Sequence, residues 1–293
     1  MKYDLPRLIA QRTKRRQFTF GTPDPLKRDQ DALLRIYLRV IRHWEGARGR
    51  LVEAYGRELE NAPYMDHKAP LGTVYDTIDD LQAEIDREAG WFQSVFLSLE
   101  VQITAWTGSI EAWHRSKWRG SILSASGVDV DTMLYAGDVQ QTVLASIRGQ
   151  LELIRDVNDQ QRARMAEAIF RGLNQRMPAR EVAKELQAIT AFGRKRSLLI
   201  ASVELQKIAT ALDRERQAEA GLKSFKWFHS KKKHPRNWHV ARNGKIYDWK
   251  TRKQVGGDEV IPADDMAGIP IRCGCRAAGY LEIEGVDDDG NPI

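Results

Sequence analysis

The 293-residue sequence has no hydrophobic run long enough to cross a membrane. Its charge-free stretches 91–99 and 101–110 are separated by Glu100, and each is shorter than the roughly 18 apolar residues of a membrane-spanning helix. The basic N-terminus lacks the apolar segment and the small-residue cleavage site of a signal peptide. We therefore expect no membrane partner, and synthesis in a reducing cytoplasm.

Cysteine is also scarce, since the chain has two, Cys273 and Cys275. One residue separates them, and a disulfide across so short a loop would be strained. A framework of disulfides is therefore excluded, and we interpret the pair as two thiols that are candidate metal ligands.

No large excess of one charge is present, because the formal net charge is +6. A content of 42% hydrophobic and 29% charged residues is typical of a soluble, folded chain. The distribution is uneven, since residues 221–255 carry eleven Lys or Arg against one acid, and residues 256–293 carry two against nine. The basic half can bind a phosphate backbone, or the acidic half can neutralise it internally, and both interpretations stay open.

The dominant helical period predicts a mainly α fold, with a long helical domain at residues 25–220. A small α+β C-terminal module is expected at residues 221–283, and residues 284–293 form an acidic tail. Residues 1–24 are basic and end in a turn-rich segment, so we expect an N-terminal arm without regular structure, either solvated or docked on a partner.

Apolar residues recur at helical spacing from Phe92 to Trp113, which predicts a long helix with one buried face. An aromatic stripe accompanies this pattern, and we interpret it as core packing, or as a face buried against a neighbouring subunit, and not as a cofactor or carbohydrate platform: Trp91, Phe92, Phe96, Trp106, Trp113 and Trp118. The expected helix breaks and boundaries are Gly72, Gly127, Pro178, Gly193 and Ala220.

Within the C-terminal module, alternating aromatic and polar residues predict strands at 225–229 and 245–249, with Asn243-Gly244 as the turn before the second. Further short strands are expected at 260–262 and 279–283. A module of about 60 residues is too small to be robust without packing on the helices or a staple.

The most specific pattern also lies in this module. His234-Pro-Arg-Asn-Trp-His239 is followed by Asn243-Gly244-Lys245, and then by Pro270-Ile-Arg-Cys273-Gly-Cys275. The joint order and spacing resemble the phage Mu protein F-like family of head proteins, in which a Trp-bearing strand leads to Arg-x-x-His, Gly-Lys and Pro-x-x-Cys-x-Cys. The matching positions are Glu204 in the preceding helix, Trp227, Arg236, His239, Gly244, Cys273 and Cys275.

The resemblance covers about residues 130–283, with two departures. Ser202-Val203 stand where the family has Arg-Thr, and Lys231-Lys232-Lys233 stand where an acid often precedes Arg-x-x-His. Any site that requires those groups is in doubt, whereas the fold implied by the resemblance is not.

The resemblance implies a minor capsid or head-morphogenesis protein of a tailed bacteriophage, and not an enzyme. It implies a place in the virion head, at the portal vertex or the inner capsid surface, after assembly in the host cytoplasm. The implied partners are the portal protein, the major capsid or scaffold proteins, and packaged double-stranded DNA.

Two thiolates with His239, and with His234 or His229, suffice for a tetrahedral zinc site that staples the module. Such a zinc would be structural, because a closed shell leaves no position for substrate. The alternative is that Cys273 and Cys275 are small, poorly exposed residues beside a hydrogen-bonded His239.

Cations next to an aromatic residue, as in Lys231–Lys233 with Trp238, are typical of nucleic-acid surfaces, although a charge run is commonly just a solvated face. The candidate residues for DNA contact are Lys231, Lys232, Lys233, Arg236, Arg242 and Lys245.

Two rival functions remain at this point. The first is a nuclease or toxin-like enzyme, in which His239 acts as base beside Arg236, or activates Cys275 as a nucleophile. Neither version has a third orienting group at a recognisable spacing. The second is a cytoplasmic DNA-binding assembly factor that is absent from the virion.

Overall fold

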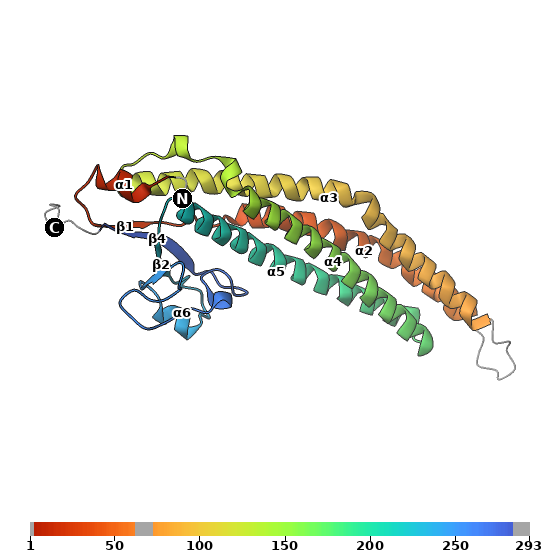
Figure 1. Ribbon diagram of the computed structural model, residues 1–293. Helices are drawn as coiled ribbons and strands as arrows, with labels where there is room; N and C mark the ends of the chain where they lie inside the picture. Colours follow the sequence, from red (N-terminus) through yellow and green to blue (C-terminus); the bar gives the residue numbers. More distant parts are fainter. Residues whose placement is uncertain (1–2, 62–72, 284–293) are drawn as a thin grey trace. The chain divides into compact units, whose positions relative to one another are not determined.

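The computed structural model describes residues 3–61 and 73–283. Its four long helices are α2 (Lys27–Asn61), α3 (Thr73–Ser126), α4 (Gln140–Asn174) and α5 (Ala179–Glu219) (Figure 1). The short elements are α1 (Leu5–Ala10), β1 (Gln17–Phe20), η1 (Asp131–Met133), η2 (Ala136–Val139), β2 (Ser224–Phe228), α6 (Asn237–Ala241), β3 (Ile246–Asp248), η3 (Ala263–Asp265) and β4 (Arg276–Glu282). Long helices followed by a small sheet confirm the predicted fold class. No described helix combines the length and apolarity of a membrane span.

The chain divides into two compact units. Unit 1 consists of Met1–Gln30, Trp106–Ser146 and Ser202–Ile293, and unit 2 consists of Asp31–Ala105 and Ile147–Ala201. The division expected from the sequence, at residues 24, 220 and 283, stays a prediction.

In unit 2, helix α2 has one face that is buried along its length. Among its buried residues, an alternation of steps of four and three is followed by Leu33, Tyr37, Val40, Trp44, Ala47, Leu51 and Ala54, and the same face is widened by Ile36, Ile41 and Tyr55. This average of about 3.5 residues is the period of coiled-coil packing, in which an apolar seam stays turned toward the partner helices. The apolar seam of α2 is thus a main part of the unit 2 core.

Polar side chains join the helices of unit 2 at defined points. Trp44 Nε1 donates to Oδ1 of Asn158 across 3.1 Å, which links α2 to α4. His43 Nε2 donates to the Glu88 carbonyl across 2.8 Å, and the His43 ring stacks on Trp91 with centroids 4.1 Å apart. These contacts give partners to polar atoms that apolar packing alone would leave unsatisfied.

Helix α5 begins at Ala179, directly after Pro178, and runs unbroken to Glu219. The prediction of a separate helix from Gly193 is therefore wrong. A Cβ at Gly193 would lie 2.7 Å from both Ile41 Cδ1 and Gln161 Nε2. This glycine allows two helices to approach closely and does not end one.

Helix α3 confirms the long helix predicted over residues 92–113. It ends at Ser126, and Gly127 follows with a φ of +71°, as expected for a glycine just beyond a helix end. The predicted break at Gly72 lies outside the described residues. Trp118, one of the aromatic residues interpreted as core, is fully buried.

The sheet of unit 1 has the strand order β1-β4-β2-β3, and all neighbours are antiparallel. Strands β2, β3 and β4 confirm the predictions at 225–229, 245–249 and 279–283. The strand predicted at 260–262 is wrong, because Val260 forms only an isolated bridge with Lys253.

The N-terminal segment is folded into unit 1, which corrects the prediction of an arm without regular structure. Strand β1 pairs with β4, from Gln17 opposite Glu282 to Phe20 opposite Gly279. Buried apolar side chains of this segment that join one cluster with Trp118 are Tyr3, Leu5, Ile9, Phe18 and Phe20. The segment thus supplies both an edge strand and part of a core.

Candidate functional site

Three short pieces of the C-terminal module bring the family-motif residues together. Trp227 lies on β2, His239 lies on α6, and Cys273 and Cys275 lie in the loop that leads into β4. All four side chains are buried. The Trp227 ring meets the His239 ring edge-on, with centroids 5.0 Å apart and planes at 74°. The Trp227 indole therefore packs directly against the His239 ring.

His239 and the two cysteines form a thiol–imidazole cluster. Nδ1 of His239 lies 3.5 Å from the Cys273 sulfur and 3.6 Å from the Cys275 sulfur. Nε2 of the same ring lies 2.9 Å from Oδ1 of Asp265. A carboxylate accepts a hydrogen bond, so Nε2 carries the ring proton in the neutral imidazole and Nδ1 turns its lone pair to the sulfurs.

Asp265 is itself held by two further donors. Trp238 Nε1 donates to its Oδ2 across 3.0 Å, and the Arg242 guanidinium donates to the same oxygen across 2.6 Å. Burial opposes ionisation of Asp265, but the hydrogen bonds from His239 and Arg242 outweigh it and lower the pKa of the carboxyl group. The carboxylate that orients His239 is therefore fixed in both position and charge.

Glu259 forms the second acidic centre of the module. It accepts from Arg242 Nε at 2.7 Å, from the Tyr247 hydroxyl at 2.8 Å and from Lys245 Nζ at 3.3 Å. Burial works against ionisation, yet the hydrogen bonds from Arg242, Tyr247 and Lys245 lower the pKa of Glu259. Arg242 thus joins both acids, and its guanidinium carbon lies 5.3 Å above the Trp227 ring.

The two thiols share their protons unequally. A hydrogen bond from Cys275 lowers the pKa of Cys273 to about 5 against the opposing effect of burial, and backbone N–H groups of Cys275 and Gly268 act in the same direction. The same bond and the burial of the side chain raise the pKa of Cys275. The hydrogen bond between the two thiols therefore favours the thiolate at Cys273 over that at Cys275.

Glycines set the backbone around the cluster. Gly244 has a φ of +82°, and its N–H donates to the Trp227 carbonyl across 2.8 Å. A Cβ at Gly274, between the two cysteines, would lie 3.0 Å or less from Lys232 Cε and Ser230 Cβ. The Gly-Lys and Cys-Gly-Cys parts of the motif thus serve the local fold.

The predicted nucleic-acid residues separate into two groups. Lys231, Lys232 and Lys233 are exposed, and Arg236 is half-buried with Nη2 donating to the Ile271 carbonyl. Arg242 is buried between the two acids, and Lys245 pairs with Glu259. The structure therefore leaves no face of Arg242 for a phosphate, which differs from the prediction. Internal neutralisation therefore holds for Arg242 and Lys245, and binding of a phosphate backbone by the exposed lysines stays a prediction.

Two other predicted residues lie outside the cluster. His234 is exposed, and it is not among the three residues whose ligand atoms group together. Glu204 lies on α5, where its carboxylate accepts from Lys207 Nζ across 2.7 Å. Neither residue therefore belongs to the group formed by His239, Cys273 and Cys275.

Sequence reasoning missed the residues that anchor the module to α5. Gln217 Nε2 donates to the Ala277 carbonyl across 2.8 Å, and Gln217 Oε1 accepts from Trp249 Nε1 across 3.0 Å. Arg276 Nη2 donates to Asp213 Oδ2 across 2.8 Å, and His114 lies on the other oxygen of Asp213. Isolated polar residues on a helix carry no distinctive pattern, so only the fold shows these contacts.

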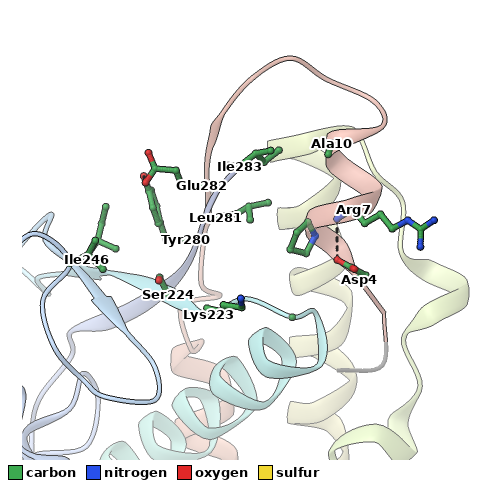
Figure 2. Close-up of a pocket in the computed structure, with 13 residues that line it drawn as sticks. Asp4, Arg7, Ala10, Lys223, Ser224, Ile246, Tyr280, Leu281, Glu282 and Ile283 are labelled. Carbon is green, nitrogen blue, oxygen red and sulfur yellow. Dashed lines mark hydrogen bonds between the residues drawn. The ribbon is translucent and has the colours of Figure 1, made fainter. Parts of the chain in front are cut away.

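A separate cavity of about 510 Å³ lies between α1 and the sheet (Figure 2). Asp4, Arg7, Lys223, Tyr280 and Glu282 are among its lining residues, and Asp4 Oδ1 accepts from the Arg7 N–H at its edge. None of the candidate residues lines this cavity. Its walls mix charged and apolar groups without a cluster of catalytic type.

The burial of His239 and the partners of its two ring nitrogens limit its use as a general base. His239 is 2% exposed, one ring nitrogen is engaged by Asp265, and the other faces two sulfurs. A general base needs a free nitrogen within reach of a substrate proton. The geometry therefore argues against the version of the enzyme alternative in which His239 acts as a general base.

Comparison with protein families gives a match to the family described as "Phage Mu protein F like protein" over residues 159–278. This confirms the resemblance inferred from the motif. The matched segment includes Glu204, Trp227, Arg236, His239, Gly244, Cys273 and Cys275, and it begins within α4.

The chain is also similar to an uncharacterized protein of Haemophilus influenzae, with 22% identity over 174 residues. The alignment covers 59% of this chain and 37% of the relative, so the chain spans well under half of that protein. No solved structure matches.

Proposed function

We propose, from the match of residues 159–278 to the Mu F-like family, that this chain is a minor head protein of a tailed bacteriophage. In this proposal it acts in head assembly at or near the portal. The observation that carries the proposal is that Trp227, His239, Cys273 and Cys275 of the family motif meet in one buried cluster. A motif whose members build the fold is expected in a protein that works by assembly.

Helix α3 offers an apolar surface for contact with a head subunit. Leu97 is 74% exposed and Val101 is 68% exposed, and a separation of four residues places them one turn apart on the same face. Burying apolar side chains of this size stabilises an interface by about 1.5–3 kcal/mol each when the burial is complete. The partner proposed for this face is the portal or major capsid protein.

The assembly role is tested by deleting the gene from the phage or prophage that carries it. The expected result is a loss of DNA-filled heads in electron micrographs, restored by the wild-type gene supplied in trans. Complementation by the Leu97→Ser, Val101→Ser double variant is expected to fail. Leu198→Ser, which changes a 45% exposed leucine on α5, serves as the control and is expected to restore filled heads. Normal numbers of filled heads after deletion would contradict the proposal.

A second part of the proposal is weak, sequence-independent contact of Lys231, Lys232 and Lys233 with packaged DNA. All three are exposed, and Lys232 Nζ donates across 3.0 Å to the backbone carbonyl of Arg272, which is also exposed. Lysines that neutralise phosphates release counterions, so such binding weakens steeply with salt.

The DNA contact is tested by a mobility-shift titration across salt concentrations. Changing Lys231, Lys232 and Lys233 to Glu is expected to abolish the shift, or to reduce the slope of log K against log salt by about two to three. The control changes three exposed lysines elsewhere, Lys117, Lys184 and Lys195, to Glu and so alters the net charge equally. Equal loss in both triple variants would mean that only net charge matters, which contradicts a contact at the lysine run.

A further inference from the structure

His239, Cys273 and Cys275 place three ligand atoms at the spacing of a metal coordination shell. Nδ1 and the two sulfurs all lie within 4.8 Å of one another, and among the residues described these three form the one such group of His, Cys, Asp or Glu. A tetrahedral zinc with Zn–S bonds of about 2.3 Å and Zn–N bonds of about 2.0–2.1 Å sets nitrogen and sulfur roughly 3.5 Å apart. The distances of 3.5 and 3.6 Å match that separation.

The symmetry of the cluster also points to a shared centre. A neutral imidazole nitrogen has one lone pair and accepts along one direction. Both sulfurs nevertheless lie almost equally far from Nδ1 of His239. A single hydrogen bond would join the nitrogen to one thiol. Two sulfurs at nearly equal distances from one nitrogen fit three ligand atoms that face a common ion better.

The second ring nitrogen has the partner that a metal-bound histidine requires. Histidine ligands usually donate their other N–H to a carboxylate, which fixes the tautomer and the ring orientation. His239 Nε2 donates to Asp265 across 2.9 Å, and Asp265 is held in turn by Trp238 and Arg242. Nδ1 is thus aimed at the sulfurs before any ion binds.

Beside the sulfurs there is room for one more ligand and little else. A cavity of about 20 Å³ is lined by the two cysteines, His239, Ser230 and His234. This volume holds about one water molecule. His229 also lines it, but its Nδ1 accepts from the Lys231 N–H across 3.2 Å, which leaves its proton on the other nitrogen.

We propose that Cys273, Cys275 and His239 bind one zinc ion, with a water molecule in the fourth position. Both cysteines bind as thiolates, and any proton left on a thiol passes to solvent, so two thiolates offset the two charges of the ion. The zinc joins α6 to the loop before β4, and so closes a module whose apolar core is small. The inference goes beyond the assembly role and does not depend on it.

The first test uses the full wild-type chain, purified under reducing conditions without chelator. Elemental analysis is expected to find about one zinc per chain, as a tetrahedral thiolate and imidazole site predicts. After removal of the zinc, titration with cobalt(II) is expected to produce sulfur-to-cobalt charge-transfer absorption that saturates at one equivalent. Wild-type protein that contains no zinc, and that gives no charge-transfer band with cobalt, would overturn the proposal.

Variants then assign the ligands. Cys273→Ser and His239→Ala are expected to lose at least about nine-tenths of the bound metal, measured on the monodisperse fraction from gel filtration. His234→Ala, which removes an exposed histidine that lines the same cavity, tests whether a protein side chain takes the fourth position, and is expected to keep the wild-type zinc content. If His234→Ala lost its metal as Cys273→Ser does, the assignment of three protein ligands would be wrong.

Discussion

Unit 2 and the C-terminal module are stabilised by different kinds of buried group. In unit 2, a regular seam of apolar residues runs along α2. The module has a small buried apolar set: Phe225, Trp227, Tyr247, Ile261, Ala267, Cys273, Cys275 and Ala277. Beside this set, Glu259 and Asp265 both accept hydrogen bonds from Arg242, and Asp265 also orients His239. The stability of the module thus depends on directional polar contacts, whereas that of the helices in unit 2 depends on the burial of apolar surface.

This difference decides which charged residues can serve as a binding surface. In the helical unit, most ion pairs involve exposed side chains, as in Arg194 with Glu45. In the module, one stretch of basic sequence supplies both a buried structural cation, Arg242, and exposed lysines at 231–233. A run of basic residues in a sequence therefore does not define one basic surface, because acidic partners can bury some of its members.

The largest effect is expected from truncating the seam of unit 2. Trp44→Ala removes a fully buried indole and its bond to Asn158, and should lower the free energy of unfolding by about 3–5 kcal/mol. Urea denaturation measures the loss, and hydrogen exchange should locate it in unit 2. Leu97→Ala at a 74% exposed position is the control, with a change within about 0.5 kcal/mol. A similar loss in both variants would contradict the seam.

The polar network of the module provides the next test. Arg242→Ala leaves Glu259 and Asp265 without their shared cation, and should cost about 2–3 kcal/mol because both acids are partly buried. Removing the exposed cation of unit 2 in Arg194→Ala should cost about 0–1 kcal/mol. Chemical denaturation of both variants compares the two regions directly. Equal effects would remove the distinction between structural and solvated ion pairs.

A smaller effect is expected where two helices approach closely. Gly193→Ala places a methyl group 2.7 Å from Ile41 Cδ1 and should cost about 1–2 kcal/mol, even though alanine favours the helix. Gly149→Ala on α4, where no atom lies within 4 Å of the new Cβ, should instead stabilise unit 2 by about 0.5–1 kcal/mol. Thermal unfolding gives the sign of each change. A stabilising Gly193→Ala would show that the helices are not in close contact there.

The smallest effect is a pH dependence in unit 2. Burial lowers the pKa of His43 from its usual 6.5, although its bond to the Glu88 carbonyl opposes this. Below pH 6.5 the unfolded chain therefore takes up a proton that the folded chain does not, and stability should fall as the pH drops toward the folded-state pKa. Urea denaturation followed by tryptophan fluorescence at a series of pH values should show this fall, and His43→Gln should flatten it. An unchanged slope in the variant would assign the effect to another group.

Much of this architecture follows from sequence periodicity, but the contacts between distant residues do not. Both elements were predictable because the helical period of residues 92–113 and the alternation in β2 reflect local secondary structure. A glycine such as Gly193 is an ordinary signal of a helix end. Here the glycine is needed because side chains of neighbouring helices lie close to it, and the periodicity of one segment does not show such neighbours. Strand β1 was missed because four residues within a basic segment give too short a pattern.

The candidate site was predictable in the same uneven way. The resemblance named His239, Cys273 and Cys275, which the structure brings together. Asp265 and Glu259 were not named, because their partners lie 26 and 17 residues away and a carboxylate at such distances has no fixed spacing. The excess of acid after residue 256 was the available signal, and it left internal neutralisation open without naming the pairs.

The central claim is that this chain is built into a phage head. Quantitative mass spectrometry of purified, DNA-filled particles tests it most directly, with peptides from both unit 1 and unit 2 measured against the major capsid protein. The account predicts both sets of peptides at a low, constant ratio to the capsid protein. Peptides that are abundant in the lysate of the producing cells but absent from the particles would contradict it, and would identify the chain as an assembly factor that never enters the virion.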